Sequence, residues 1–292
     1  MKKIGMVGIG FMGHGIAQNL LKHGYELCVL EHAGNQPLDQ LKGAGATSTT
    51  SIATLAKASD LILLCVTGTP QVEAVLLGEG GLLKDLCPGT VVVDCSTSVP
   101  SSTERVAKAV IGAGGSFLDA PMTRTAKEAA EGRLNLLVGG DSSVLEDCRP
   151  VLETFSENIV HAGAIGAGHR MKLLHNYVSC GFIALLAEAA ACAHRSGIAS
   201  NIFVDVLAAG GGGSAALERL RPYLESGDPN CLQFSMANAR KDLSYYTAMA
   251  DDAGAAKTIG DAVLRTYDDG VKRGGNDALI LELVSLLSTR EN

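Results

Sequence analysis

The 292-residue sequence predicts an α/β protein in which a doubly wound parallel sheet is followed by an all-helical domain, the two joined by a long helix. Up to about residue 160, short apolar runs alternate with helical segments, which is typical of a parallel sheet with helices on its faces. After residue 163 the pattern is helical to the C-terminus, with no convincing strand. A chain of this length exceeds most single cores, so we expect two domains, residues 1–162 and 163–292.

The N-terminus has the pattern of a dinucleotide-binding turn. Residues 3–7 form a short apolar run, three glycines follow in GxGxxG spacing, and a helical segment runs from residue 14 to residue 23. In this setting the first glycine permits a tight turn, the second lets the backbone approach a pyrophosphate, and the third lets the helix pack on the strand. Helix N-terminal N–H groups can then bind the phosphates of a Rossmann cofactor. The expected binding residues are Gly8, Gly10, Phe11, Met12 and Gly13.

A second apolar run, residues 25–31, ends on an acid. Glu31 lies about 18 residues after Gly13, where a carboxylate accepts hydrogen bonds from the adenosine ribose. A carboxylate also repels a 2'-phosphate, and residues 32–35 contain no arginine or lysine to bind one. The sequence therefore favours NAD over NADP. The alternative is that Glu31 merely ends a strand in solvent.

Residues 60–66 and 90–95 are the clearest buried strands. Ligands of such sheets bind beyond the carboxyl ends of the strands. We therefore expect Val66, Thr67 and Thr97, which end or follow these two runs, to edge the cofactor site. Taken one at a time, the hydroxyl residues could equally be helix caps or turn residues.

Composition excludes several classes of protein. No apolar run reaches the length of a membrane span and the N-terminus lacks the core of a signal peptide, so a cytoplasmic protein without membrane contact is expected. The net charge of -7 and the lack of basic blocks argue against a nucleic-acid surface. The eight cysteines are scattered without a CxxC pair, which indicates reduced core residues and no metal site.

Residues 168–194 read as one apolar-rich helix that carries Lys172 and Asn176 four positions apart, on one face. A lysine and an amide placed together could hold a substrate hydroxyl and exchange a proton with it. This chemistry requires partial burial of Lys172, because an exposed ammonium has a pKa of about 10.4 and burial lowers it. From the local residues alone, a solvated helix lysine is an equally good interpretation.

Four separated motifs resemble those of the beta-hydroxyacid dehydrogenases, a family that includes 3-hydroxyisobutyrate dehydrogenases, over nearly the whole chain. They are the glycine turn, Asp119-Ala120-Pro121, Gly166-Ala167-Gly168 leading to Lys172 and Asn176, and Lys241-Asp242. The resemblance implies that Lys172 is the general acid/base, that Asn176 orients the substrate, and that Lys241 reaches toward the nicotinamide and substrate. Relatives commonly associate through the helical half, so a homodimer or homotetramer is expected.

One loop departs from the common family pattern Asp-Ala-Pro-Val-Ser-Gly-Gly. This chain has Asp119-Ala120-Pro121-Met122-Thr123-Arg124-Thr125. Arg124 adds a planar cation suited to a carboxylate, sulfonate or phosphate, so Thr123, Arg124 and Thr125 are expected to bind a small anionic substrate. A branch that includes sulfolactaldehyde reductase is similar here and at Ser179, which lies two helical turns after Lys172. The alternative is that Arg124 pairs with Glu128 or Glu131 on the surface.

The leading hypothesis is an NAD-dependent oxidoreductase that interconverts a short anionic beta-hydroxy acid, or hydroxy sulfonate, and its semialdehyde, with 3-sulfolactaldehyde as the most specific substrate. Alternatives are a reductase of succinic semialdehyde, tartronate semialdehyde or the 3-hydroxyisobutyrate type, and a 2-(hydroxymethyl)glutarate dehydrogenase. A non-catalytic NAD-binding protein has no need of Lys172, Asn176 and Lys241 together. Imine reductases share the scaffold but usually lack a lysine at the position of Lys172.

Overall fold

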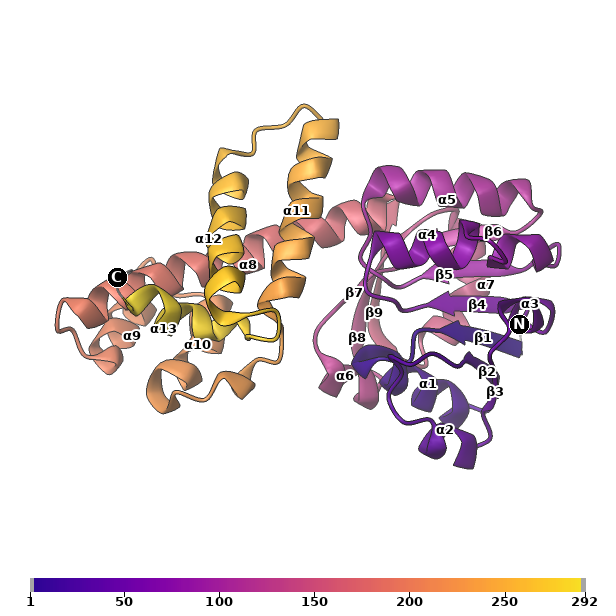
Figure 1. Ribbon diagram of the computed structural model, residues 1–292, viewed down its shortest axis with the longest axis horizontal. Coiled ribbons are helices and arrows are strands. Elements are labelled where there is room, and N and C mark those ends of the chain that lie inside the picture. The colour runs from indigo at the N-terminus through magenta and orange to yellow at the C-terminus, as the bar shows by residue number, and fades with distance from the viewer. Residues whose placement is uncertain (1–2, 290–292) are drawn as a thin grey trace. The chain divides into compact units, whose positions relative to one another are not determined.

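The computed structural model describes residues 3–289, and the chain divides between Lys172 and Leu173 into two compact units (Figure 1). The division falls inside helix α8 (Ala167–Arg195), so this helix contributes to both units. The sequence places a domain boundary at residue 163 instead, at the end of strand β9 (Ser156–Gly163). That boundary stays a prediction.

Unit 1 is built on a nine-stranded sheet with the order β3-β2-β1-β4-β5-β6-β8-β7, and β9 pairs with β8. The pairs from β3 to β6 are all parallel, whereas β8 runs antiparallel to β6 and β7. The order reverses between β1 and β4, which is the switch point where doubly wound sheets bind ligands. The remaining strands are β1 (Lys3–Val7), β2 (Glu26–Leu30), β3 (Thr47–Thr49), β4 (Leu61–Leu64), β5 (Val91–Asp94), β6 (Ser116–Asp119), β7 (Met122–Thr123) and β8 (Leu134–Gly139).

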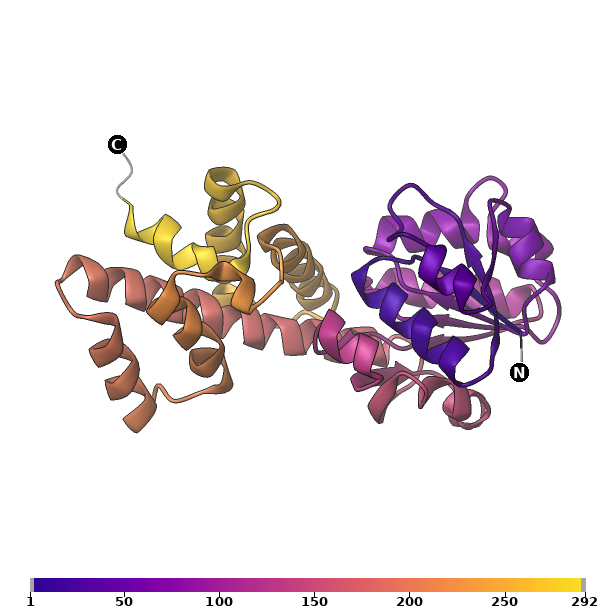
Figure 2. The ribbon, with the colours of Figure 1, turned by 90° about the horizontal axis from the view of Figure 1, so that it is seen from below.

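Helices cover both faces of this sheet (Figure 2). Buried residues of α1 and α7 share one hydrophobic cluster with the strands, and those of α3, α4 and α5 share the other. The helices of unit 1 before α8 are α1 (Phe11–Lys22), α2 (Asp39–Gly43), α3 (Ile52–Lys57), α4 (Thr69–Leu77), α5 (Pro100–Gly112), α6 (Ala126–Glu131) and α7 (Ser142–Leu152), with a 3-10 turn at Leu82–Asp85.

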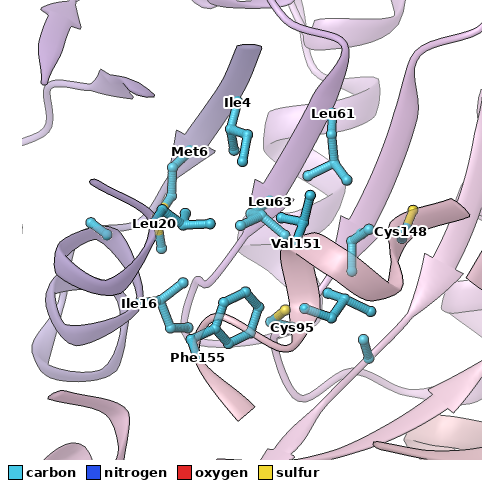
Figure 3. Packing of buried hydrophobic residues seen from close by; sticks show 14 of the residues in the cluster. Ile4, Met6, Ile16, Leu20, Leu61, Leu63, Cys95, Cys148, Val151 and Phe155 are labelled. Atoms are coloured by element: carbon cyan, nitrogen blue, oxygen red, sulfur yellow. The ribbon is translucent and has the colours of Figure 1, made fainter. Parts of the chain in front are cut away.

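Strand β4 shows why the parallel strands read as unbroken apolar runs. Leu61 and Leu63 point into the cluster under α1 and α7, while Ile62 and Leu64 point into the cluster on the opposite face. All four side chains are fully buried, as expected for a strand covered on both sides. Figure 3 shows the first cluster, where strand residues Ile4, Met6, Leu61 and Leu63 pack near Ile16, Leu20, Val151 and Phe155.

Unit 2 is helical within the described residues 173–289, apart from one isolated bridge between Ser235 and Leu279. Its core surrounds Tyr267, which is fully buried and donates its hydroxyl to the carbonyl of Cys180 at 3.1 Å. After α8 come α9 (Ser200–Ala209), α10 (Ala215–Ser226), α11 (Met236–Asp252), α12 (Thr258–Gly274) and α13 (Leu283–Ser288), with 3-10 turns at Pro229–Cys231 and Ile280–Glu282.

The predicted fold class is confirmed, and the differences concern helix starts. Helix α1 begins at Phe11, directly after the glycine turn, rather than at residue 14. Thr69 and Pro70 form the start of α4, close behind the predicted cofactor residue Thr67. Proline suits this place because its fixed φ fits the first helical turn, where its missing N–H would have no partner anyway.

Candidate functional site

The glycine turn after β1 has the shape that a dinucleotide requires. Gly8 has a φ of 96°, and a Cβ there would lie 2.2 Å from the carbonyl O of Cys65. A Cβ on Gly13 would lie 2.0 Å from the carbonyl O of Gly8. At Gly10, by contrast, nothing lies within 4 Å of the Cβ position. The turn is therefore closed on its inner side and open at Gly10, the N-cap of α1, where a pyrophosphate would fit against backbone N–H groups.

The two residues between these glycines differ in exposure. Phe11 is 73% exposed at the first position of α1, and Met12 is partly buried against the core. Both stay predicted cofactor residues.

Glu31 follows β2 and is held by two neighbours. Its carboxylate accepts hydrogen bonds from Ser48 Oγ at 2.6 Å and from Lys42 Nζ at 2.9 Å. These contacts, with the Ser48 bond the larger cause, lower the pKa of Glu31. Glu31, Asn35 and Lys42 line one surface pocket, and Asn35 Oδ1 accepts the N–H of Ile9 at 3.2 Å, which ties the pocket to the glycine turn.

Lys42 is a residue beside Glu31 that sequence reasoning missed. Residues 32–35 contain no arginine or lysine, but the chain returns through α2 and brings Lys42 to Glu31. The two residues are 11 positions apart, and no helix or strand periodicity predicts a contact at that separation.

The segments after β4 and β5 lie side by side. Leu64 and Asp94 are partners in the parallel register, and the N–H of Val66 donates to Ser96 Oγ at 3.0 Å. Val66 and Thr67 therefore share one edge of the sheet with Thr97, which follows Ser96. This is the carboxyl edge beside the switch point, as expected for ligand-binding residues.

Lys172 lies against the predicted substrate loop. Its Nζ donates to the carbonyl O of Met122 at 2.7 Å, and its side chain is partly buried. Met122 precedes Thr123, which is buried and accepts a hydrogen bond from Asn135 at 3.1 Å. Arg170, two residues before Lys172, pairs with Glu104 instead. The structure therefore brings the predicted proton carrier to the start of the predicted anion-binding loop.

Arg124 adopts a left-handed backbone conformation with a φ of 82°, the only non-glycine residue with positive φ in the range 3–289. Its guanidinium pairs with Glu157 and donates to the carbonyl O of Arg133. The two surface partners considered from the sequence are wrong. Glu128 caps α6 by accepting from Thr125, and Glu131 pairs with Arg133.

In unit 2, a buried carboxylate connects two of the predicted site residues. Asn176, 7% exposed, donates Nδ2 to Asp242 Oδ2 at 2.6 Å, and the other carboxylate oxygen lies 2.9 Å from Lys241 Nζ. The Asn176 Oδ1 lies 3.0 Å from His175 Nδ1. Asp242 belongs to the Lys241-Asp242 motif, but the sequence did not predict its hydrogen bond with Asn176. Ser179 is partly buried on α8.

No group of three or more His, Cys, Asp or Glu side chains suited to a metal ion occurs within residues 3–289.

Comparison with known proteins identifies the family of the chain. Residues 3–163 match the NAD binding domain of 6-phosphogluconate dehydrogenase, and residues 166–287 match the NAD-binding domain of NADP-dependent 3-hydroxyisobutyrate dehydrogenase. The NAD-dependent L-serine dehydrogenase of Pseudomonas aeruginosa is 32% identical over 280 residues, 94% of each chain. The 3-sulfolactaldehyde reductase of Escherichia coli is 31% identical over 288 residues, 97% of this chain and 96% of that one.

The fold is shared with a solved structure of Mycobacterium tuberculosis 3-hydroxyisobutyrate dehydrogenase with L-serine, which covers 99% of this chain and 100% of its own at 24% identity and a TM-score of 0.87. Two family models that together span most of the chain, and relatives more than 30% identical over nearly their whole length, therefore show the family. The chain belongs to the beta-hydroxyacid dehydrogenase family, and it is an NAD(P)-dependent oxidoreductase that acts on CH–OH groups.

Proposed function

We propose that the protein interconverts a short anionic beta-hydroxy acid, or hydroxy sulfonate, and its semialdehyde with NAD as the preferred cofactor. The observation that carries this proposal is the contact between Lys172 Nζ and the carbonyl O of Met122. It places an ammonium group beside the loop of Thr123, Arg124 and Thr125, whose hydroxyls and guanidinium suit an anion. A proton carrier and an anion-binding loop next to each other are what such a substrate needs.

The chain's own residues would divide the work as follows. A bound NAD supplies the hydride-transfer chemistry. In the reductive direction the Lys172 ammonium gives its proton to the aldehyde oxygen, and in the oxidative direction the neutral amine takes it back. Asn176, one turn further along α8, uses one amide hydrogen on Asp242 and keeps the other for the substrate oxygen. Lys241 is assigned beside the cofactor, and Ser179 to the substrate, by resemblance.

Arg124 makes the anion part of the proposal specific. Its guanidinium pairs with the Glu157 carboxylate, so a substrate anion would take the place of that carboxylate. A sulfonate or a carboxylate both fit a guanidinium fork. The relatives named for 3-sulfolactaldehyde and L-serine support a short substrate that carries a sulfonate or a carboxylate, and 3-sulfolactaldehyde is the most specific candidate.

Kinetics with three variants test the role of Lys172. Lys172→Ala should lower kcat by about 10²–10⁴-fold while the protein still binds NADH. Lys172→Arg should be similarly slow, because arginine keeps the charge but does not release a proton. Lys108→Ala, an exposed lysine on α5, is the control and should keep wild-type rates. Wild-type turnover in Lys172→Ala would overturn the assignment.

A substrate panel tests the choice of anion. Purified protein with NADH is offered 3-sulfolactaldehyde, tartronate semialdehyde and succinic semialdehyde, and with NAD it is offered L-serine, 3-hydroxyisobutyrate and 2-(hydroxymethyl)glutarate. We expect the highest kcat/KM for the sulfonate. A carboxylate that is turned over far better rejects the sulfonate but keeps the reaction class. Tight NADH binding without turnover of any compound rejects the enzyme proposal.

We also propose that a second copy of the chain covers an apolar stripe on α8. Leu174, Val178, Phe182 and Leu185 recur at helical spacing and are each 42–66% exposed. Ile202 on α9 is exposed as well. By length and composition α8 could also cross a membrane, but 44% of its apolar window is buried inside the protein. Exposed apolar residues gathered on one helix face are typical of an interaction site.

Size-exclusion chromatography with light scattering, which measures the molar mass in solution, checks this association. The wild type should have a multiple of the chain mass, and Phe182→Asp with Leu185→Asp should reduce it. Ile111→Asp, which changes an exposed apolar residue on α5, is the control. A monomeric wild type, or sedimentation with phosphatidylcholine–phosphatidylglycerol vesicles, would contradict a second copy as the occupant.

A further inference from the structure

A buried histidine that the proposed reaction does not use lies three residues before Lys172. His169 is fully buried in the first turn of α8, and its ring has a hydrogen-bond partner on both nitrogens. Nδ1 lies 2.8 Å from Thr103 Oγ1, and Nε2 lies 3.1 Å from the carbonyl O of Ser96. The imidazole therefore connects the start of α8 to two neighbouring segments that lie 66 and 73 residues earlier in the chain.

Each of these segments leads to a part of the proposed site. Ser96 accepts the N–H of Val66 on its hydroxyl and is followed by Thr97, so it lies among the residues assigned to the cofactor. Thr103 lies in α5, which begins directly after this loop. His169 itself precedes Lys172 by one helical turn.

Two buried carboxylates surround the ring. Asp119 accepts the N–H of Gly166 at 2.7 Å and the N–H of His169 at 2.8 Å, which fixes the start of α8. Its Oδ2 lies 3.8 Å from Nδ1, and Asp94 Oδ2 lies 3.9 Å from Nε2. Burial raises the pKa of Asp94, and the neighbouring His169 and the Ser96 N–H oppose that shift. A side chain without polar atoms would fill this space but would leave the Ser96 carbonyl without its ring partner.

A buried polar cluster of this kind lowers stability unless every group has a partner, so it is expected where it holds particular segments in place. Buried polar groups destabilise a fold when a partner is removed, and an apolar residue is the simpler way to fill a core. Here the fixed quantity is the placement of the Ser96–Ser98 loop against the first turn of α8. Both elements belong to unit 1, so the contact does not depend on how the two units are arranged.

We propose that His169 is a positioning residue that holds the cofactor loop, through the Ser96 carbonyl, at a fixed distance from the helical turn that carries Lys172. The inference rests on the proposed function, since it takes the cofactor loop and the proton carrier as given. It predicts that the Nε2 edge of the ring matters for cofactor binding, whereas the Nδ1 edge anchors the ring to α5.

Three substitutions separate the two edges. In His169→Gln the amide reaches the position of Nε2 and can donate to Ser96, in His169→Asn it reaches only the position of Nδ1, and His169→Leu removes both contacts. Thr103→Val is the matched control, because it removes the Nδ1 partner and leaves the Ser96 contact. NADH dissociation constants, kcat and melting temperatures are measured for all four proteins at a temperature well below unfolding.

We expect His169→Gln and Thr103→Val to keep NADH affinity within about threefold of the wild type. His169→Asn and His169→Leu should weaken it by about tenfold or more and should also lower kcat, the usual result when a positioning contact is lost. A merely structural histidine would instead lower the melting temperature and leave the kinetics of the folded enzyme unchanged. Equal NADH affinity in His169→Gln and His169→Asn overturns the proposal even if His169→Leu fails to fold.

Failure of the proposed function would look different. If the wild type binds NADH but turns over no compound of the panel, the reaction is wrong, and the ranking of NADH affinities among the His169 variants still tests the positioning role.

Discussion

The open space at Gly10 leads to a prediction that separates cofactor binding from folding. Gly10→Ala adds a Cβ that meets nothing within 4 Å, at a φ of -79° that alanine adopts readily. Such a replacement stabilises a protein by about 0.4–1 kcal/mol through the unfolded chain. At roughly 2–4 °C per kcal/mol for a domain of this size, the melting temperature should stay constant or rise by up to about 4 °C. The new methyl group occupies the side from which a pyrophosphate would approach, so the Kd for NADH should rise at least about tenfold.

Gly13→Ala should instead lower the melting temperature. Its Cβ would lie 2.0 Å from the carbonyl O of Gly8, a backbone atom that cannot move aside freely. Overpacking of this kind costs about 1–3 kcal/mol or more, which corresponds to a melting temperature lower by about 2–12 °C. Calorimetry and NADH fluorescence titration measure both quantities, and Gly112→Ala, another open glycine, is the control. Wild-type NADH affinity in Gly10→Ala would refute the reasoning.

Three further predictions concern charge and reactivity. Glu31→Gln should raise kcat/KM with NADPH relative to NADH, because the repelling carboxylate is lost while Lys42 remains, and adding Lys42→Met should cancel the gain in steady-state assays. Glu157→Gln should lower KM for the anionic aldehyde about two- to fivefold, the effect of an exposed ion pair, and an unchanged KM would remove Arg124 from the substrate site. Burial raises the pKa of the Cys148 thiol to about 12, so below that pH it stays protonated and should react with an aromatic disulfide reagent only after unfolding, whereas the exposed Cys87, Cys192 and Cys231 should react at once.

Local patterns predicted most of the fold, because each reports on the surroundings of its own segment. The glycine turn, the acid after the second strand, and the lysine and asparagine on one helix face all follow from spacings of a few residues. Strand β4 was recognised because burial on both faces demands an unbroken apolar run.

Contacts between distant segments could not be predicted in this way. Lys42 reaches Glu31, Asp242 reaches Asn176 across 66 residues, and His169 was given no role from the sequence. A polar side chain is usually exposed, so nothing in the sequence indicates that this histidine is fully buried. Such contacts depend on strand order and helix packing, which pairwise spacing does not encode.

The placement of the unit division inside α8 matters for anyone who recombines this enzyme with its relatives. A crossover between residues 172 and 173 would transplant Asn176 and Lys241 while leaving the native Lys172, and it would join two half-helices of different ancestry in mid-turn. A crossover in the loop between β9 and α8 would take all three residues from the same parent protein. Hybrids joined at this loop should therefore keep Lys172, Asn176 and Lys241 from one parent. Hybrids joined between residues 172 and 173 should not.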